Sequence, residues 1–200
     1  ALWVLTGLRD GALILWDATA GRLVRTLQGH TKEIASARFS ANGEFILSAS
    51  TDGTARLWRA ATGKEVQRFQ GHAGAVHSAE FSPDGRFVLT GAMDFTARLW
   101  QTATGRELCR LLSFRDGNWV VVDPEGRFDT SNLDEIRDLH WVMPDDPFKP
   151  LPLEIFLRDY YEPRLLQRLI AGERFKPVKS LSELNRTQPN VHIASIQPQA

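Results

Sequence analysis

The sequence predicts an all-β fold, a partial β-propeller of four-stranded antiparallel blades, followed by a small mixed α/β connector. Two observations lead to this prediction. Trp16, Trp58 and Trp100 recur at an interval of 42 residues, each at the end of a short strand-like run. Gly-His pairs at 29–30 and 71–72 keep the same interval. A repeat of about 40–45 residues with a Gly-His pair and a late Trp is typical of propellers that use one repeat per blade.

The second repeat defines the expected blade. Its short apolar runs alternate with turns that contain Asn-Gly, Asp-Gly and Thr-Gly. Such turns connect antiparallel strands because they require residues that tolerate a positive φ. The expected strands are 34–39, 45–49, 54–58 and 65–69.

The third repeat follows the same plan, and the first repeat is cut. In the third repeat we expect strands at 76–81, 87–91, 96–100 and 107–111. The first repeat starts at its second strand, 2–6, and the chain begins without Met. We therefore expect the chain to be a fragment of a longer protein.

One turn departs from the repeat. Phe95 follows Asp94 at the position that Gly11 and Gly53 occupy in the other two repeats. Because this turn position favours glycine, we expect the third turn to be strained or differently shaped.

Residues 1–114 resemble the WD-repeat family on these motifs. In that family four side chains of each blade form a hydrogen-bonded relay: the His after Gly, a Ser or Thr of the second strand, the Asp of the next turn and the Trp of the third strand. The resemblance implies that the matching positions are structural tetrads. They are His30, Ser48, Asp52 and Trp58, then His72, Thr90, Asp94 and Trp100, and, in the cut repeat, Thr6, Asp10 and Trp16.

A structural role for these tetrads agrees with their chemistry. A carboxylate, an imidazole, a hydroxyl and an indole N–H can satisfy one another where water is excluded. The alternative is a Ser-His-Asp catalytic triad. We expect scaffold, and no catalytic residue, because the set recurs in successive blades and a Ser within a strand presents no exposed nucleophile.

The regular array ends after the third repeat, where Ser113-Phe114 replaces the expected Gly-His. We assign 1–114 to the propeller blades, 115–187 to the connector and 188–200 to a tail or the start of another β domain. The connector opens with a degenerate half-repeat, 119–122 and 127–129, which either extends the last blade or forms a separate hairpin.

The rest of the connector is expected to contain one or two short helices. The segment 153–161 has helical character, and a second helix is expected between Pro163 and Gly172, with a further turn at 180–185. Four prolines between 144 and 152 predict an absence of regular structure there. The segment 189–196 alternates like an edge strand.

The connector carries a second resemblance. The stretch 118–129, the Leu-His-Trp run at 139–141 and the Asp-Tyr-Tyr-Glu-Pro run at 159–163 resemble the segment that follows the propeller in bacterial multidomain WD-repeat proteins with a caspase-like peptidase domain. None of that domain's catalytic residues lies in this chain, so the resemblance implies no activity for it.

Composition limits the functions that the chain can have. Lys+Arg and Asp+Glu both total 24, so no basic field is available to hold nucleic acid. No apolar run approaches the roughly 20 residues that cross a bilayer. The single cysteine suits a reducing compartment, so we expect a cytoplasmic location. No spacing of His, Cys and Asp indicates a metal, and no cofactor is expected.

Several single residues are interpreted as structural groups and not as functional sites. Cys109 aligns with solvent-type residues, which predicts a place on the outer edge of a blade. His77 is expected in the interior, and the recurring Arg56 and Arg98 indicate a repeated structural contact. The solitary histidines and paired acidic residues of the connector are expected to be ordinary polar groups; they are His140, His192, Asp134, Glu135, Asp145 and Asp146.

The leading hypothesis is a non-catalytic protein–protein interaction scaffold that binds proteins or peptides and the remaining blades of its parent chain. Binding is expected on one rim, where the repeats differ; its residues are Arg9, Lys32, Glu33, Thr51 and Met93. Sequence changes without functional effect on a solvent-exposed surface would explain the same variation. The alternative function is a targeting or regulatory arm of a caspase-like peptidase whose catalytic domain lies outside this chain.

Overall fold

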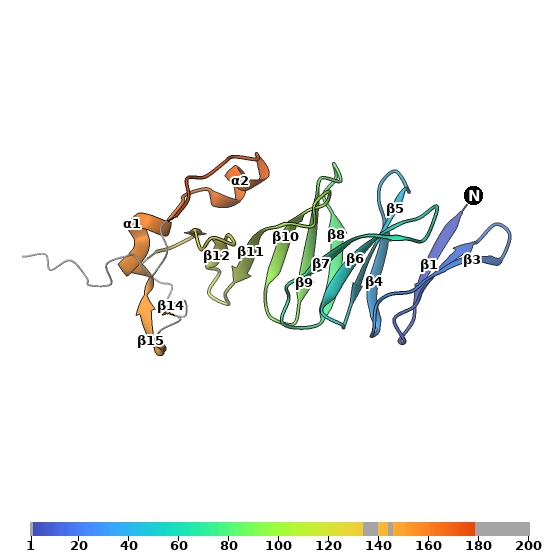
Figure 1. The fold of residues 1–200 in the computed structure, drawn as a ribbon, viewed down its shortest axis with the longest axis horizontal. Coiled ribbons are helices and arrows are strands. Elements are labelled where there is room, and N and C mark those ends of the chain that lie inside the picture. The colour runs from blue at the N-terminus through green and yellow to red at the C-terminus, as the bar shows by residue number, and fades with distance from the viewer. Residues whose placement is uncertain (1, 134–139, 144–145, 179–200) are drawn as a thin grey trace, which may run out of the picture.

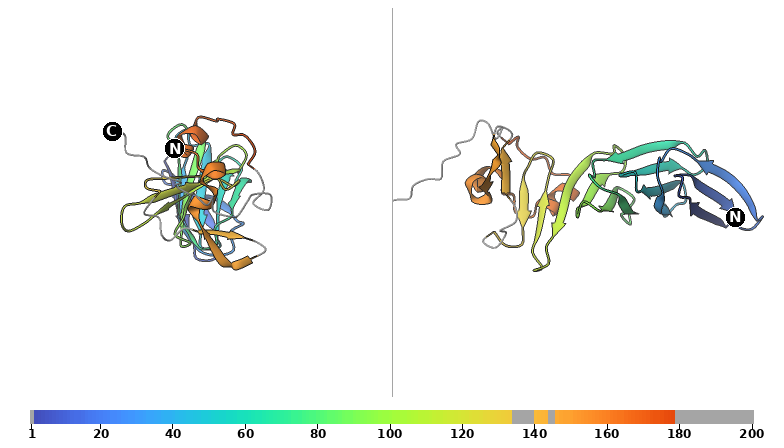
Figure 2. Two further views of the ribbon diagram at one scale, coloured as in Figure 1. Left: turned by 90° about the vertical axis from the view of Figure 1, so that its left-hand side faces the viewer. Right: turned by 90° about the horizontal axis from the view of Figure 1, so that it is seen from below.

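The computed structural model describes residues 2–133, 140–143 and 146–178, and about half of them lie in antiparallel strands. Three sheets follow one another in chain order, from the N-terminal sheet to the connector (Figure 1). Seen from below, they lie along an arc (Figure 2, right). The expected fold class, a partial β-propeller, is confirmed.

The first two sheets are the first and second blades. The first blade has the strand order β1-β2-β3, and the second has the order β4-β5-β6-β7. The strands of the first blade are β1 (Trp3–Gly7), β2 (Leu13–Asp17) and β3 (Arg22–Leu27). Those of the second blade are β4 (Ile34–Phe39), β5 (Phe45–Ser50), β6 (Thr54–Arg59) and β7 (Glu65–Gln70).

The third blade continues into the half-repeat. Its own strands are β8 (Val76–Phe81), β9 (Phe87–Ala92), β10 (Ala97–Gln101) and β11 (Glu107–Ser113). The half-repeat supplies β12 (Trp119–Val122) and β13 (Phe128–Thr130), and β12 pairs with β11 over Arg110↔Val122 to Ser113↔Trp119. The half-repeat therefore extends the last blade into a six-stranded sheet and does not form a separate hairpin.

The blades are held together by apolar side chains from facing sheets. Leu47, Leu57 and Phe69 of the second blade pack with Val88 and Trp100 of the third, and all five are almost fully buried. An equivalent cluster joins the first and second blades. Because each sheet buries one face against its neighbour, the 42-residue repeat of the sequence becomes a repeat of the core.

His77 is exposed, so the prediction of an interior position is wrong. The pairing of β8 with β9 shifts between Val76 and Ser78, and His77 is the extra residue at this irregularity. A β-bulge changes the direction of the side chain that it carries, and alignment with Ala35 does not reveal this.

The connector contains a two-stranded ribbon, β14 (His140–Met143) and β15 (Asp146–Pro152). The expected absence of regular structure in this segment is therefore wrong for Pro147, Pro150 and Pro152. Each strand of a two-stranded ribbon has a free edge, where a missing N–H breaks no pairing, so β15 tolerates proline. Some expectations lie outside the described residues; they concern Asp134, Glu135, Pro144, Asp145, His192 and the segments 180–185 and 189–196.

The remaining elements are short. A 3₁₀ turn, η1 (Leu153–Phe156), leads into α1 (Leu157–Tyr160), within the segment expected to be helical. The second helix, α2 (Leu165–Ile170), begins after Pro163 and is followed by Gly172 with φ of 77°.

Helix α2 packs on the third blade and buries Cys109. Leu165 is fully buried in one cluster with Phe87, Leu99 and Cys109. Cys109 has no exposed surface, so its predicted place on the outer edge is wrong. In the second blade the equivalent face of the sheet meets the third blade, whereas in the third blade α2 covers it. Burial, reinforced by the negative charges of Glu107 and Asp123, raises the pKa of the Cys109 thiol to about 12.

We expect Cys109 to report whether α2 is docked. A thiolate is the reactive species, so the native thiol should resist a thiol reagent at pH 8 and react fully only in denaturant. Leu165→Ala should accelerate labelling at least tenfold, because removing a buried Leu costs about 2–5 kcal/mol. Gln167→Ala, at an exposed position of the same helix, is the control. Equal labelling rates for Leu165→Ala and wild type would contradict this assignment.

Candidate functional site

Four side chains of the second blade form a buried chain of hydrogen bonds, which we call the brace. His30 lies just before β4, Ser48 in β5, Asp52 in the β5–β6 turn and Trp58 in β6. The His30 Nδ1 atom is 2.8 Å from Asp52 Oδ2, and its Nε2 atom is 2.8 Å from Ser48 Oγ. Trp58 Nε1 donates to the same Ser48 Oγ at 2.8 Å. The four residues therefore connect the entry segment, two strands and a turn.

The electrostatics of the brace fix its proton positions. Burial alone would raise the pKa of Asp52, but hydrogen bonds from Thr54, His30 and the Thr31 N–H hold it at about 2. The ionised carboxylate only accepts, so Nδ1 of His30 carries a proton. Burial lowers the pKa of His30 despite the neighbouring carboxylate, so the ring is neutral at pH 7. Nε2 is then the acceptor, and Ser48 donates its hydroxyl proton to it.

The third blade repeats this geometry. His72 Nδ1 lies 2.9 Å from Asp94 Oδ2, and its Nε2 lies 2.7 Å from Thr90 Oγ1. Trp100 Nε1 donates to Thr90 Oγ1 at 2.8 Å. Burial also lowers the pKa of His72. A Thr hydroxyl and a Ser hydroxyl thus serve equally as the central group.

The first blade has only part of the brace. Trp16 Nε1 donates to Thr6 Oγ1 at 2.8 Å. Asp10 Oδ1 accepts from the Ala12 N–H within its own turn, at 3.0 Å. Among the described residues, no His joins these groups.

Two further parts extend each complete brace. Sequence reasoning missed the first, and for the second it predicted a repeated structural contact of Arg56 and Arg98 without naming the partners. Thr54 donates to Asp52 Oδ1 at 2.7 Å, and Thr96 does the same to Asp94. Buried Arg56 donates to Glu65 Oε2 at 2.8 Å and lies 3.7 Å from Asp52. Arg98, Glu107 and Asp94 repeat these contacts. The signal was present in the sequence, since each of these residue types recurs at the 42-residue interval.

The connectivity of Ser48, His30 and Asp52 is that of a catalytic triad, but its setting differs. Ser48 is 0 % exposed, and the side chain of His30 is equally inaccessible. The Ser48 hydroxyl also accepts the Trp58 N–H, so it is engaged on both sides. A nucleophile must reach substrate, whereas these groups reach only one another. The arrangement can therefore hold the strands in fixed positions, and its Ser and His groups are not accessible at the surface.

The rim residues lie in the turns at the Asp end of the blades. Arg9, Lys32, Glu33 and Met93 are exposed, and Thr51 is half-buried because its N–H donates to the Glu33 carbonyl at 3.0 Å. Met93 is 62 % exposed.

Phe95 lies beside Met93 on the rim, and sequence reasoning missed it as a surface group. It is 91 % exposed and has φ of 62°, a conformation that a bulky residue adopts only at a cost. Its position in a turn that otherwise uses glycine was the available signal.

The part of the chain that the structure describes offers neither a metal centre nor a membrane span. Within residues 2–133, 140–143 and 146–178, no group of three or more His, Cys, Asp or Glu side chains is placed to hold a metal ion. No helix in those ranges has the length and apolar character needed to cross a membrane.

Comparison with known proteins gives matches within the blades. Residues 21–59 and 63–101 each match the family model described as WD domain, G-beta repeat. These two segments of the chain are therefore similar to WD40 repeats.

Three relatives illustrate the similarity. The chain is 40 % identical over 47 residues to NACHT domain- and WD repeat-containing protein 1 of Mus musculus, covering 24 % of this chain and 3 % of that protein. It is 47 % identical over 36 residues to Mitochondrial division protein 1 of Vanderwaltozyma polyspora, covering 18 % and 5 %. It is 39 % identical over 46 residues to Nuclear distribution protein PAC1 of Mycosarcoma maydis, covering 23 % and 10 %. The matched segments thus span a tenth or less of these relatives.

Removing the central hydroxyl should destabilise the second blade. Ser48→Ala leaves the His30 Nε2 and Trp58 Nε1 atoms buried without this partner, at about 1–3 kcal/mol for each group. Ser48→Thr should retain most of the stability, because Thr90 performs the same role in the third blade. Ser78→Ala, at an exposed Ser of β8, is the control. Urea unfolding measures the three differences, and a loss below about 0.5 kcal/mol for Ser48→Ala would refute a structural brace.

Acidification should destabilise the fold in two stages. The pKa of His30 and His72 is lowered from 6.5, so below pH 6.5 the unfolded chain binds more protons than the folded protein. Stability should be constant above pH 7 and then fall by up to about 1.4 kcal/mol per pH unit for each imidazole. Asp52, whose pKa drops from 3.8 to about 2, adds a loss between those values. Urea midpoints across pH 8 to 3 measure this, and an unchanged midpoint between pH 7 and pH 5 would contradict it.

Proposed function

We propose that this chain is a non-catalytic protein–protein interaction scaffold whose blades present partner-binding turns on one rim. The observation that carries the proposal is the burial of the brace: the Ser, His and Asp groups that could do chemistry are consumed in holding strands together. The WD40 matches support the same function, because repeats of this kind mediate protein–protein interactions.

The rim is suited to binding because its support is rigid. The Thr31 N–H donates to Asp52 at 3.1 Å, so the entry segment that carries Lys32 and Glu33 is tied to the brace. A turn that is ordered before binding loses little conformational entropy when a partner docks. Met93 and Phe95 add exposed apolar and aromatic area, which is the kind of group that carries interface energy.

We also propose that further blades of the parent chain pack on the first blade. Val4 and Trp16 occupy the positions of Ile46 and Trp58, 42 residues later in the sequence. Ile46 and Trp58 are 0 % and 1 % exposed, in the cluster that joins the second blade to the first. Val4, by contrast, is 42 % exposed. A preceding blade would cover this face in the same way.

The alternative function, a targeting or regulatory arm of a caspase-like peptidase, stays a prediction from the connector sequence, and so does a cytoplasmic location. The reading frame that follows residue 200 tests the alternative. A His and a Cys in a caspase-like context there would favour it, and an early stop would remove it.

Loss of binding from rim variants tests the scaffold. The triple variant Arg9→Ala, Lys32→Ala, Met93→Ala should fold normally, because all three side chains are exposed. We expect partners that co-purify with the parent protein from its native host to fall by at least about tenfold, which corresponds to about 1.4 kcal/mol.

A matched triple variant is the control for this experiment. Arg22→Ala, Leu23→Ala and Lys64→Ala change the same kinds of side chain at exposed positions away from the rim. Quantitative mass spectrometry compares the recovered partners. If both triple variants retain every partner that wild type recovers, binding does not use the rim and the proposal fails.

A further inference from the structure

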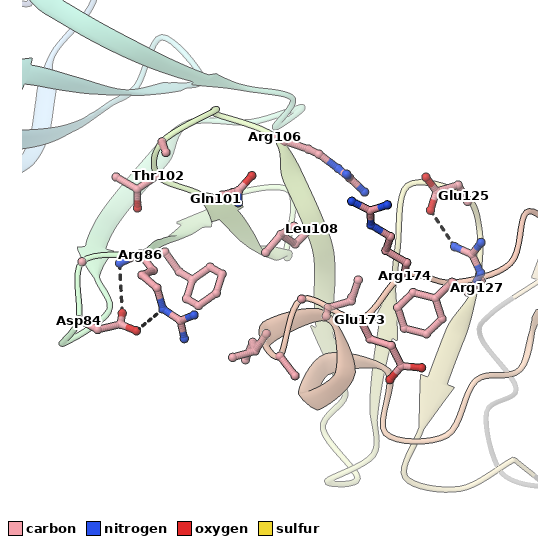
Figure 3. A pocket seen from close by; sticks show the side chains of 18 of the residues that line it. Asp84, Arg86, Gln101, Thr102, Arg106, Leu108, Glu125, Arg127, Glu173 and Arg174 are labelled. Atoms are coloured by element: carbon pink, nitrogen blue, oxygen red, sulfur yellow. Dashed lines mark hydrogen bonds and ion pairs between the residues drawn. The ribbon is translucent and has the colours of Figure 1, made fainter.

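A groove runs between the outer end of the blades and the segment after α2. Its volume is about 1240 Å³. One side is formed by the turns around Asp84 and Thr102, and the other by α2 and the segment after it (Figure 3). We call this segment, residues 172–178, the strap. The groove joins parts of the chain that are distant in sequence, and it lies outside the brace and the rim.

The strap is fixed to the third blade. Buried Arg127 donates to the Lys176 carbonyl at 2.6 Å. The Phe175 ring is contacted by two guanidinium groups, with Arg127 at 5.1 Å and Arg168 at 4.5 Å from its centroid. Phe175 also packs against the cluster that contains Leu165 and Cys109. The strap is therefore ordered before any ligand binds, which lowers the entropy cost of binding.

The groove combines an apolar lining with two arginines that have no partner among the described residues. Val66 and Ile170, which are 47 % and 36 % exposed, line it together with Leu108. Arg106 and Arg174 point toward one another at the opening (Figure 3). Neither of their side chains has an ion pair or hydrogen bond among the described residues. Two unpaired guanidinium groups that face one another repel, and an anion between them would relieve this repulsion.

The other charged groups of the groove are held in ion pairs, and two of the arginines concerned, Arg127 and Arg168, each hold two carboxylates. Asp84 pairs with Arg86 at 2.6 Å, and Glu125 pairs with Arg127 at 2.7 Å. Glu173 pairs with Arg168 of α2 at 2.7 Å. Among the described residues that line the groove, the charged side chains without an ion pair are therefore Arg106 and Arg174. The Thr102 hydroxyl also lines the groove, and it has no hydrogen-bond partner among the described residues.

We propose that this groove binds an acidic peptide segment of a partner protein. A side-chain carboxylate of the peptide is held between Arg106 and Arg174, and adjacent apolar side chains pack on Val66 and Ile170. This is a second site, separate from the rim, and it does not depend on the rim being used.

A peptide fits this groove better than a nucleic acid does. A phosphate backbone carries regularly spaced negative charges, and it would meet the carboxylates of Asp84, Glu125 and Glu173 along the groove. A peptide can place one carboxylate at the arginine pair and apolar groups elsewhere. Because the arginine pair lies beside an apolar lining, the groove favours a peptide segment that contains both acidic and apolar side chains.

Selection from a random octapeptide display library on the immobilised full chain tests the proposal. We expect the recovered peptides to be enriched in Asp or Glu next to Leu, Ile, Val or Phe. Fluorescence anisotropy with the most enriched peptide should show that Arg106→Ala and Arg174→Ala each weaken binding about tenfold, as expected for a lost charge-assisted hydrogen bond. Val66→Ser and Ile170→Ser should weaken it as well.

The controls separate this site from the rim and from folding. Arg22→Ala removes an exposed arginine elsewhere, and the rim triple variant leaves the groove intact, so both should bind the peptide as wild type does. The thermal unfolding temperature of Arg106→Ala and Arg174→Ala should be no lower than that of wild type, because neither side chain has a partner among the described residues and each change removes a repulsion.

Any of three results on the groove would overturn the proposal, and so would a fourth on the rim. The three results on the groove are an absence of acidic enrichment in the selected peptides, unchanged affinity in the Arg106→Ala and Arg174→Ala double variant, and displacement of the peptide by an equal concentration of single-stranded DNA. The last result would identify the pair as a phosphate site. Loss of peptide binding in the rim triple variant alone would likewise assign the peptide to the rim.

Discussion

One buried hydroxyl group holds each complete blade together. In the second blade, Ser48 Oγ accepts a hydrogen bond from the Trp58 indole N–H and donates one to His30 Nε2. The Nδ1–H of His30 in turn donates to ionised Asp52. This directional chain passes through two strands, the turn between them and the segment that enters the blade. Inside a sheet, where water is excluded, each of these groups would be costly to leave unpaired, so the chain of bonds works as one unit.

The consequences of this constraint extend to the surface. Because the brace anchors Asp52 and the Thr31 N–H together, it positions the turns that form the rim. Because the Ser, His and Asp groups of the brace are engaged with one another, the exposed functional groups lie in the turns and the connector. The groove beside Arg106 and Arg174 depends on the connector, since it is formed where α2 and the strap cover the face of the last blade.

The repeat made most of the fold predictable, and each error has its own cause. Residues that recur at a fixed interval predicted the tetrads, the strands and the unusual turn at Phe95, because each position can be compared with the equivalent position of another repeat. Cys109 was misplaced because its surroundings come from α2, which has no counterpart in the other blades. His77 was misplaced by a bulge, and β15 by prolines that a two-stranded ribbon tolerates. The Arg56–Glu65 pair recurred as clearly as the tetrads, but geometry was needed to join its two members.

The tautomeric state of His30 and His72 tests the account most directly. Nitrogen-15 NMR of the imidazole rings at pH 7 reports both the protonation state and the exchange of the ring protons. The account requires neutral rings that carry their proton on Nδ1, with that proton protected from exchange with water. Charged rings, a proton on Nε2, or exchange as rapid as that of an exposed histidine would show that the brace is open to solvent, and its structural role would have to be abandoned.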